Sequence, residues 1–151
     1  MTKPTLVLLP GLICDSALWA RQIQSFEDRF EIRCPSLIGD DDMARLAETV
    51  LSGLPECFCL AGLSMGGYVA LEMMRQAPAR IKRLALLATS ARADTDRQAR
   101  RRRGLIALSG RGTFSGVTPR LLPQLLHPSR LDDVELVKTI TAMAARVGRE
   151  G

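Results

Sequence analysis

Aromatic residues and long hydrophobic runs are scarce in this sequence, and each scarcity excludes a class of protein. The 151 residues include one tryptophan, one tyrosine and four phenylalanines, which is too few to provide the stacking platforms of a nucleic-acid-binding surface. No apolar run reaches the roughly 18 residues of a membrane-spanning helix, and residues 6–9 form too short a run for a signal-peptide core. We therefore expect a cytoplasmic protein with no membrane partner.

Cysteine and histidine are also few, and their placement argues against a metal site. Cys14, Cys34, Cys57 and Cys59 do not have the spacing of zinc ligands, and the single histidine, His127, is remote in sequence. We expect reduced, buried thiols and no disulfide framework. No metal ion and no organic cofactor are expected.

Positive charge is in excess, and the excess is local. Lysine and arginine together number 21 against 16 acidic residues, a formal net charge of +5. A solvated helix face is the usual origin of a charge run, so nucleic-acid binding is kept only as an alternative and no nucleic-acid partner is expected. The run consists of Arg97, Arg100, Arg101, Arg102, Arg103, Arg111 and Arg120.

Short apolar runs alternate with helical patterns in the first half of the chain, which is typical of a parallel sheet covered by helices. The run at residues 5–9 is nearly continuous, as in strands that are buried on both faces. Asp42 is suited to cap the helix that follows it. The expected strands are residues 5–9, 30–34, 57–61 and 84–88, and the expected helices are residues 17–26, 43–51 and 65–76.

No further strand is indicated beyond about residue 91. Glycine and proline interrupt the helical patterns there, first at Gly104, and the clearest helix begins near Leu131. We therefore divide the chain into an α/β unit at residues 1–90, with a parallel sheet of about four strands, and a helical region at residues 91–151.

The most informative motif is Gly-x-Ser-x-Gly at Gly62, Ser64 and Gly66, between an expected strand and an expected helix. A serine on such a sharp turn is held in a strained backbone conformation, with its hydroxyl above the sheet. The chain crowds itself at this turn, so the residues two before and two after the serine must lack side chains, and Gly62 and Gly66 meet that requirement. Ser64 is therefore the candidate nucleophile. A glycine-rich helix entry that only permits close packing is the alternative.

Main-chain amides near Ser64 are candidate donors to an oxyanion. Ser64 and Met65 open the expected helix, so unpaired amides and the positive end of the helix dipole face any charge that forms beside the hydroxyl. Attack on an ester carbonyl creates an oxyanion there, and the Met65 N–H is the first expected donor. The Leu12 N–H, in the loop after the first strand, is the second. An ordinary strand-end turn is the alternative for that loop.

These motifs resemble the N-terminal part of α/β-hydrolase-fold proteins of the single-domain esterase and lipase-like kind. The resemblance covers residues 4–90 and implies that the remainder is the helical cap that these proteins insert after the fourth strand seen here. The sequence departs from the common form in having Pro10-Gly11 where many members have His-Gly. The matching segments are residues 8–12, Trp19 and Gln22, residues 62–67 and residues 83–89.

The same resemblance implies a triad of serine, acid and histidine in that chain order, with the last two after later strands. Those strands do not appear in the sequence, and a four-stranded half sheet leaves the strand at 84–88 as an open apolar edge, which soluble proteins avoid. We therefore expect a chain truncated within or just after the cap, with completion by a partner as the alternative. Ser64, Asp94 or Asp96, and His127 do follow the triad order. However, His127 lies in cap-like helical sequence without a preceding strand, so its expected role is that of a polar cap residue.

The predicted activity of the parent protein is acyl transfer to water from a small-molecule carboxylic ester or related carbonyl compound. Ser64 attacks the carbonyl, and the amides of Leu12 and Met65 hold the oxyanion. Without an acid and a histidine, the chain itself is expected to be nearly inert. The alternative is a non-catalytic interaction module that uses the exposed sheet edge and the arginine-rich region.

Overall fold

The computed structural model describes residues 2–110 and 116–150. Its centre is a parallel sheet in which β1 pairs with β2 and β3, and β3 pairs with β4, giving the order β2-β1-β3-β4. The prediction of an α/β fold with about four parallel strands is therefore confirmed. The strands are β1 (Thr5–Leu9), β2 (Glu31–Arg33), β3 (Phe58–Leu63) and β4 (Ile81–Leu87).

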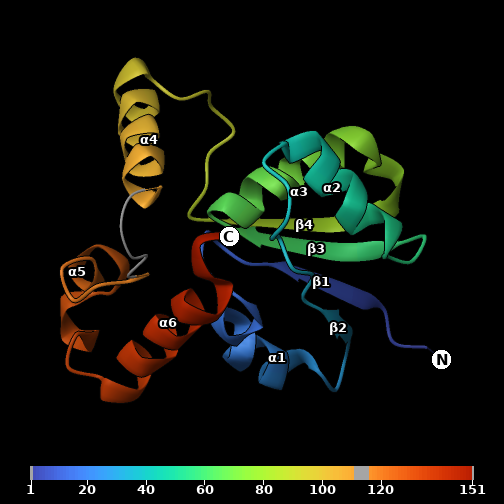
Figure 1. Cartoon of the computed structure of the whole chain (residues 1–151). Helices are drawn as coiled ribbons and strands as arrows, with labels where there is room; N and C mark the ends of the chain where they lie inside the picture. Colours follow the sequence, from blue (N-terminus) through green and yellow to red (C-terminus); the bar gives the residue numbers. More distant parts are fainter. Residues whose placement is uncertain (1, 111–115, 151) are drawn as a thin grey trace.

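Helices flank the sheet on both sides (Figure 1). On one face lie α2 (Met43–Ser52) and α3 (Met65–Gln76), and the short turn η2 (Pro78–Arg80) leads from α3 into β4. On the other face lies α1 (Ala20–Phe26), which is preceded by the 3-10 turn η1 (Ser16–Trp19). The single helix predicted at residues 17–26 is thus divided into two pieces.

Alternate side chains of the central strands enter two separate apolar clusters, because successive residues of a strand point to opposite faces. Val7 and Leu9 of β1 join Phe58 and Leu60 of β3 in the larger cluster, which packs against α2 and α3. Leu8 faces the other way and packs with its own cluster beside η1. Burial on both faces explains why β1 has a continuous apolar sequence.

Beyond β4 the described part of the chain is helical. α4 and α5 lie to one side of the sheet, whereas α6 contacts η1 (Figure 1). Val117, Leu122 and Ala144 form a third apolar cluster there, and Ile13 from the loop after β1 packs against it. The elements are α4 (Asp96–Ser109), α5 (Leu122–Leu125), η3 (Pro128–Arg130), α6 (Val134–Val147) and η4 (Gly148–Glu150).

Side-chain caps explain where the helices begin. Asp42 accepts hydrogen bonds from the amides of Ala44 (2.9 Å) and Arg45 (3.0 Å) at the start of α2, as predicted. Asp133 accepts from the Leu136 amide (3.0 Å), so α6 begins at Val134 and not near residue 131. Helix α4 continues through Gly104, since strong helix formers around it outweigh the cost of about 1 kcal/mol for one glycine.

Two other predictions about side chains have different outcomes. All four cysteines are free, but Cys57 precedes β3 in a loop and is exposed, so the prediction of buried thiols is wrong there. Burial does raise the pKa of the Cys14 and Cys34 thiols. The arginines of α4 form an exposed helix face, as predicted, and Arg111 lies outside the described residues.

Neither a membrane helix nor a metal cluster occurs in residues 2–110 and 116–150. No helix there combines the length and the apolar composition that crossing a membrane requires. No group of three or more His, Cys, Asp or Glu side chains in these residues is close enough together to hold a metal ion.

Candidate active site

Ser64 alone connects strand β3 to helix α3, at the end of the sheet where the parallel strands terminate. Its backbone has φ 53° and ψ −112°, in the left-handed half of conformational space that non-glycine residues rarely occupy. Such a conformation costs about 1–3 kcal/mol and persists only where surrounding contacts enforce it. The sharp, strained turn predicted from the motif is therefore present.

The Ser64 hydroxyl is exposed and makes no capping bond to α3. A serine at this position of a helix usually accepts a hydrogen bond from an amide of the first turn. Here the unusual backbone angles direct the side chain elsewhere. The hydroxyl is consequently available to a molecule that approaches the end of the sheet.

Glycines around Ser64 permit the chain to approach itself closely. A Cβ on Gly62 would collide with the Gly66 carbonyl oxygen and lie 2.6 Å from the Gly66 carbonyl carbon. A Cβ on Gly66 would collide with the Leu9 carbonyl oxygen at the end of β1. The obstacles are backbone atoms, which cannot rotate away as a side chain does. Both glycines therefore have the steric role predicted for them.

The end of β4 holds the backbone of Ser64 on both sides. The Ser64 amide donates to the Leu87 carbonyl (2.9 Å), and the Thr89 hydroxyl donates to the Ser64 carbonyl (2.9 Å). Between them, Ala88 also has a positive φ of 47°. Sequence reasoning missed these contacts because they depend on the register that pairs Leu63 with Leu87.

The loop after β1 lies against the turn at Ser64. A Cβ on Gly11 would stand 3.7 Å from the Ser64 Cβ, so the backbone just before Leu12 adjoins the serine. Leu12 itself is 57% exposed, and Ile13 adopts a positive φ of 52° as the loop turns. The fold thus places Gly11, the residue before Leu12, beside Ser64, and Met65 follows Ser64 directly at the start of α3.

The histidine and acids considered for the triad have other partners. The Nδ1 atom of His127 is 2.9 Å from the Ser129 hydroxyl and accepts from the Ser129 amide (3.3 Å) at the start of η3. Asp94 forms a salt bridge with Arg102 (2.7 Å), and Asp96 is exposed in the first turn of α4. Within the described ranges, no hydrogen bond joins any of these three side chains to Ser64.

Two arginines connect the C-terminal helices to the sheet unit near Ser64. Arg102 of α4 donates to the Tyr68 hydroxyl (3.0 Å) in the first turns of α3 and lies over the Tyr68 ring, 5.5 Å from its centre. Arg146 of α6 forms a salt bridge with Asp15 (2.7 Å), and that hydrogen bond lowers the pKa of the Asp15 carboxyl. These contacts thus join α4 to α3 and α6 to the loop after β1.

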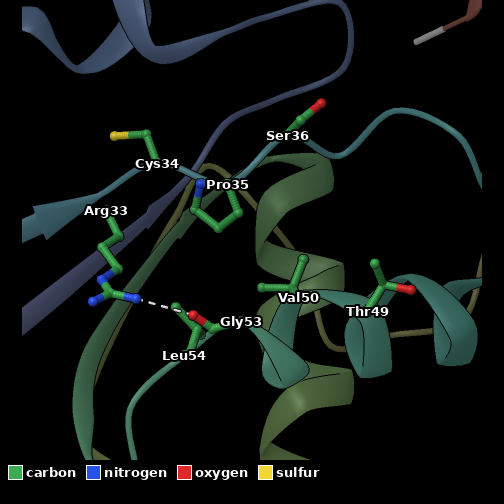
Figure 2. A pocket seen from close by; sticks show the side chains of 8 residues that line it. All are labelled: Arg33, Cys34, Pro35, Ser36, Thr49, Val50, Gly53 and Leu54. Carbon is green, nitrogen blue, oxygen red and sulfur yellow. Dashed lines mark hydrogen bonds between the residues drawn. The ribbon is translucent and has the colours of Figure 1, made fainter.

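A cavity of about 310 Å³ lies elsewhere, between the end of β2 and helix α2 (Figure 2). Arg33 and Cys34 line it on one side, and Val50 and Gly53 line it on the other. Arg33 donates to the Gly53 carbonyl (3.0 Å) across its edge. None of the predicted site residues lines this cavity, so it is separate from the Ser64 turn.

Comparison with known proteins identifies the family to which this chain belongs. Residues 6–149 match the alpha/beta hydrolase family. The chain is 30% identical over 95 residues to a pimeloyl-[acyl-carrier protein] methyl ester esterase of Nitrosomonas europaea, and 35% identical over 97 residues to the protein of the same name from Pseudoalteromonas atlantica. Each match covers 58% of this chain and 38% of the relative, so the aligned part spans well under half the length of those proteins.

Solved structures share the fold. A thermophilic esterase from Thermogutta terrifontis superposes with a TM-score of 0.81 at 24% identity, over 99% of this chain and 60% of that one. An enol-lactonase from Burkholderia xenovorans superposes with a TM-score of 0.77 at 20% identity, over 99% of this chain and 62% of that one. At these identities the likeness establishes the arrangement of strands and helices.

Proposed function

The chain belongs to the alpha/beta hydrolase family, and from that membership we propose that it is the N-terminal part of a serine esterase with Ser64 as its nucleophile. The observation that carries the proposal is the conformation of Ser64. Its hydroxyl is exposed, makes no capping bond and stands on a positive-φ turn between a buried strand and a helix. A residue that only linked β3 to α3 would have no need of this strained backbone.

The proposed reaction is acyl transfer from a carboxylic ester to water. The Ser64 oxygen attacks the ester carbonyl carbon while a histidine base takes its proton, and the carbonyl oxygen becomes an oxyanion. The alcohol leaves with that proton as the acyl-enzyme forms. Water then attacks the acyl-enzyme, which releases the carboxylic acid and returns a proton to Ser64. The amides of Leu12 and Met65 donate to that oxyanion. Support for these donors comes from the position of Met65 at the start of α3 and from the approach of the β1 loop to Ser64. This chemistry calls for no metal and no organic cofactor.

An acid and a histidine complete the proposal, and we place both on strands that follow this chain in a longer protein. Strand β4 is an edge with an apolar surface, since Leu84, Leu86 and Leu87 are 37%, 42% and 40% exposed. An exposed apolar edge of this kind calls for a covering strand. In that protein residues 91–151 form a cap over Ser64. The chain without those strands has no base for Ser64 and is nearly inert.

A small-molecule carboxylic ester is the proposed class of substrate. Support comes from relatives that are named methyl ester esterases and from solved structures of an esterase and an enol-lactonase. The acyl carrier protein in the relatives' name makes a carrier-bound methyl ester one candidate within this class.

A fluorophosphonate probe tests the nucleophile, applied to the protein encoded by the complete reading frame. We expect one labelled site at Ser64, and we expect Ser64→Ala to abolish labelling. Ser52→Ala, which removes another exposed serine at the end of α2, is the control and keeps full labelling. Labelling that persists in Ser64→Ala contradicts the proposal.

The second candidate is a non-catalytic interaction module, and the exposed apolar side chains of β4 favour it. It predicts that the 151-residue chain is stable alone and binds a protein partner equally well with Ser64→Ala. Nucleic-acid binding through α4 predicts a salt-dependent gel shift with DNA or RNA. We expect neither result from an esterase.

A further inference from the structure

Thr89 is the residue after β4 whose side chain meets the nucleophile turn. It is half-buried, and its hydroxyl donates to the Ser64 carbonyl at 2.9 Å. A Cβ on Gly67 would lie 2.5 Å from the Thr89 methyl carbon and 2.6 Å from its hydroxyl oxygen, so the side chain fills the space directly over the first turn of α3. Thr89 is therefore fixed against α3 by both packing and a hydrogen bond.

The Ser64 carbonyl belongs to the same peptide group as the Met65 amide. A peptide group is planar, and in the trans form its C=O and N–H point in opposite directions. No peptide bond in the described residues is cis. A group that fixes the direction of the Ser64 carbonyl therefore also fixes the direction of the Met65 N–H.

We propose that Thr89 is a positioning residue that orients the Met65 N–H toward the oxyanion. This inference rests on the proposed function, in which that N–H stabilises negative charge beside Ser64. The Thr89 hydroxyl holds one side of the peptide group so that the other side is presented to the substrate. Its hydrogen bond also polarises the peptide group, which strengthens the N–H as a donor.

The contact is suited to this role because it reaches the Ser64 carbonyl from outside helix α3. The Gly67 amide also donates to the Ser64 carbonyl (3.0 Å), but it belongs to the same helical turn and moves with it. Thr89 follows β4 and does not belong to α3, so its hydrogen bond fixes the Ser64 carbonyl relative to the sheet. The Leu87 carbonyl accepts from the amide on the other side of Ser64, so it does not contact the Ser64–Met65 peptide group itself.

The test is Thr89→Val in the protein encoded by the complete reading frame, with p-nitrophenyl acetate as the probe ester. Valine keeps the shape of threonine and removes the donor. We expect kcat to fall about tenfold with KM unchanged within about twofold, since an oxyanion donor acts on the transition state; loss of the donor itself costs about 10²–10³ in kcat. Thr89→Ser, which keeps the hydroxyl, retains kcat within about threefold.

A matched control separates this effect from the general loss of a hydrogen bond. Thr139 in α6 donates to the Glu135 carbonyl (2.8 Å), and Thr139→Val removes a bond of the same kind away from the turn. We expect no change in kcat. If Thr89→Val does not fold, Thr89→Ala takes its place, because it also lacks the donor and adds no contact with Gly67.

A thiol at position 64 provides a readout that does not depend on ester turnover. In Ser64→Cys, the pH dependence of alkylation, followed for that peptide by mass spectrometry, gives a thiol pKa below the ordinary value of about 8.5, since amide donors favour the thiolate. Adding Thr89→Val raises that pKa. A kcat within twofold of wild type for Thr89→Val, equal losses for Val and Ser, or an unchanged thiol pKa overturns the role of Thr89. If Ser64→Ala keeps the activity, the proposed function fails as well.

Discussion

Strands β3 and β4 are neighbours in one sheet and each contains apolar side chains, although β4 also carries Lys82 and Arg83, and the apolar side chains of the two strands meet different surroundings. In β3, Phe58 and Leu60 are 2% and 1% exposed, because α2 and α3 cover one face and the cluster beside η1 covers the other. In β4, Ile81 is buried, but the following side chains through Leu87 are exposed. The apolar side chains therefore stabilise the fold strongly in β3 and weakly in β4.

The two regions also differ in how their helices are attached. Helices α2 and α3 pack on the sheet through a continuous apolar cluster. The contacts of α4 and α6 with the sheet unit include the charged side chains Arg102 and Arg146, and α4 leaves Leu105, Ile106 and Leu108 exposed. Apolar burial is worth more than exposed ion pairs, so the sheet unit should be the more stable region.

The largest expected effect separates β3 from β4 directly. Phe58→Ala removes a ring that is 2% exposed and should lower the free energy of unfolding by about 3–5 kcal/mol. Leu86→Ala on β4 removes a side chain that is 42% exposed and should lower it by less than about 1 kcal/mol. Urea denaturation of both variants measures the difference. Equal losses would mean that β4 is covered in solution.

The second comparison sets a crowded glycine against an open one. Gly62→Ala forces a Cβ onto the backbone of Gly66 and should cost about 3 kcal/mol. Gly104→Ala, with nothing within 4 Å of the new Cβ, should add about 0.5–1 kcal/mol because alanine favours a helix. Thermal unfolding monitored by circular dichroism gives both values. A neutral Gly62→Ala would contradict the tight turn.

The smallest expected effect concerns the salt bridge between Arg146 and Asp15. The hydrogen bond from Arg146 lowers the pKa of the Asp15 carboxyl from its ordinary value. The bridge therefore stabilises the fold above about pH 4, where the carboxyl is ionised even in the unfolded chain, and loses its effect as pH falls through the folded pKa. Arg146→Met should lower the free energy of unfolding by under about 1 kcal/mol at pH 7 and by nothing once Asp15 is protonated. Arg97→Met, which removes an arginine without a salt bridge to any described residue, is the control. A loss that persists at low pH would show that packing of Arg146, and not its charge, stabilises the fold.

The nucleophile turn was predictable from sequence because its requirements are local. Steric crowding at Ser64 requires residues without side chains at positions 62 and 66, and the Gly-x-Ser-x-Gly motif has glycine at both. Thr89 was not predictable as a partner, because 25 residues separate it from Ser64 and only the pairing of β3 with β4 brings them together. Cys57 was predicted to be a buried residue of a strand, but it is exposed and precedes β3. Apolar alternation does not mark the residue at which a strand begins.

The sequence alone determined the order of strands and helices, the cap at Asp42, and the strained serine between two glycines. These features depend on residues within a few positions of one another. The tertiary structure decided which apolar strand is covered, which loop approaches Ser64 and which side chain holds its carbonyl. Those outcomes follow from the register and layering of the sheet. They bring together residues that are far apart in the chain, and the local sequence around one such residue does not indicate its partner.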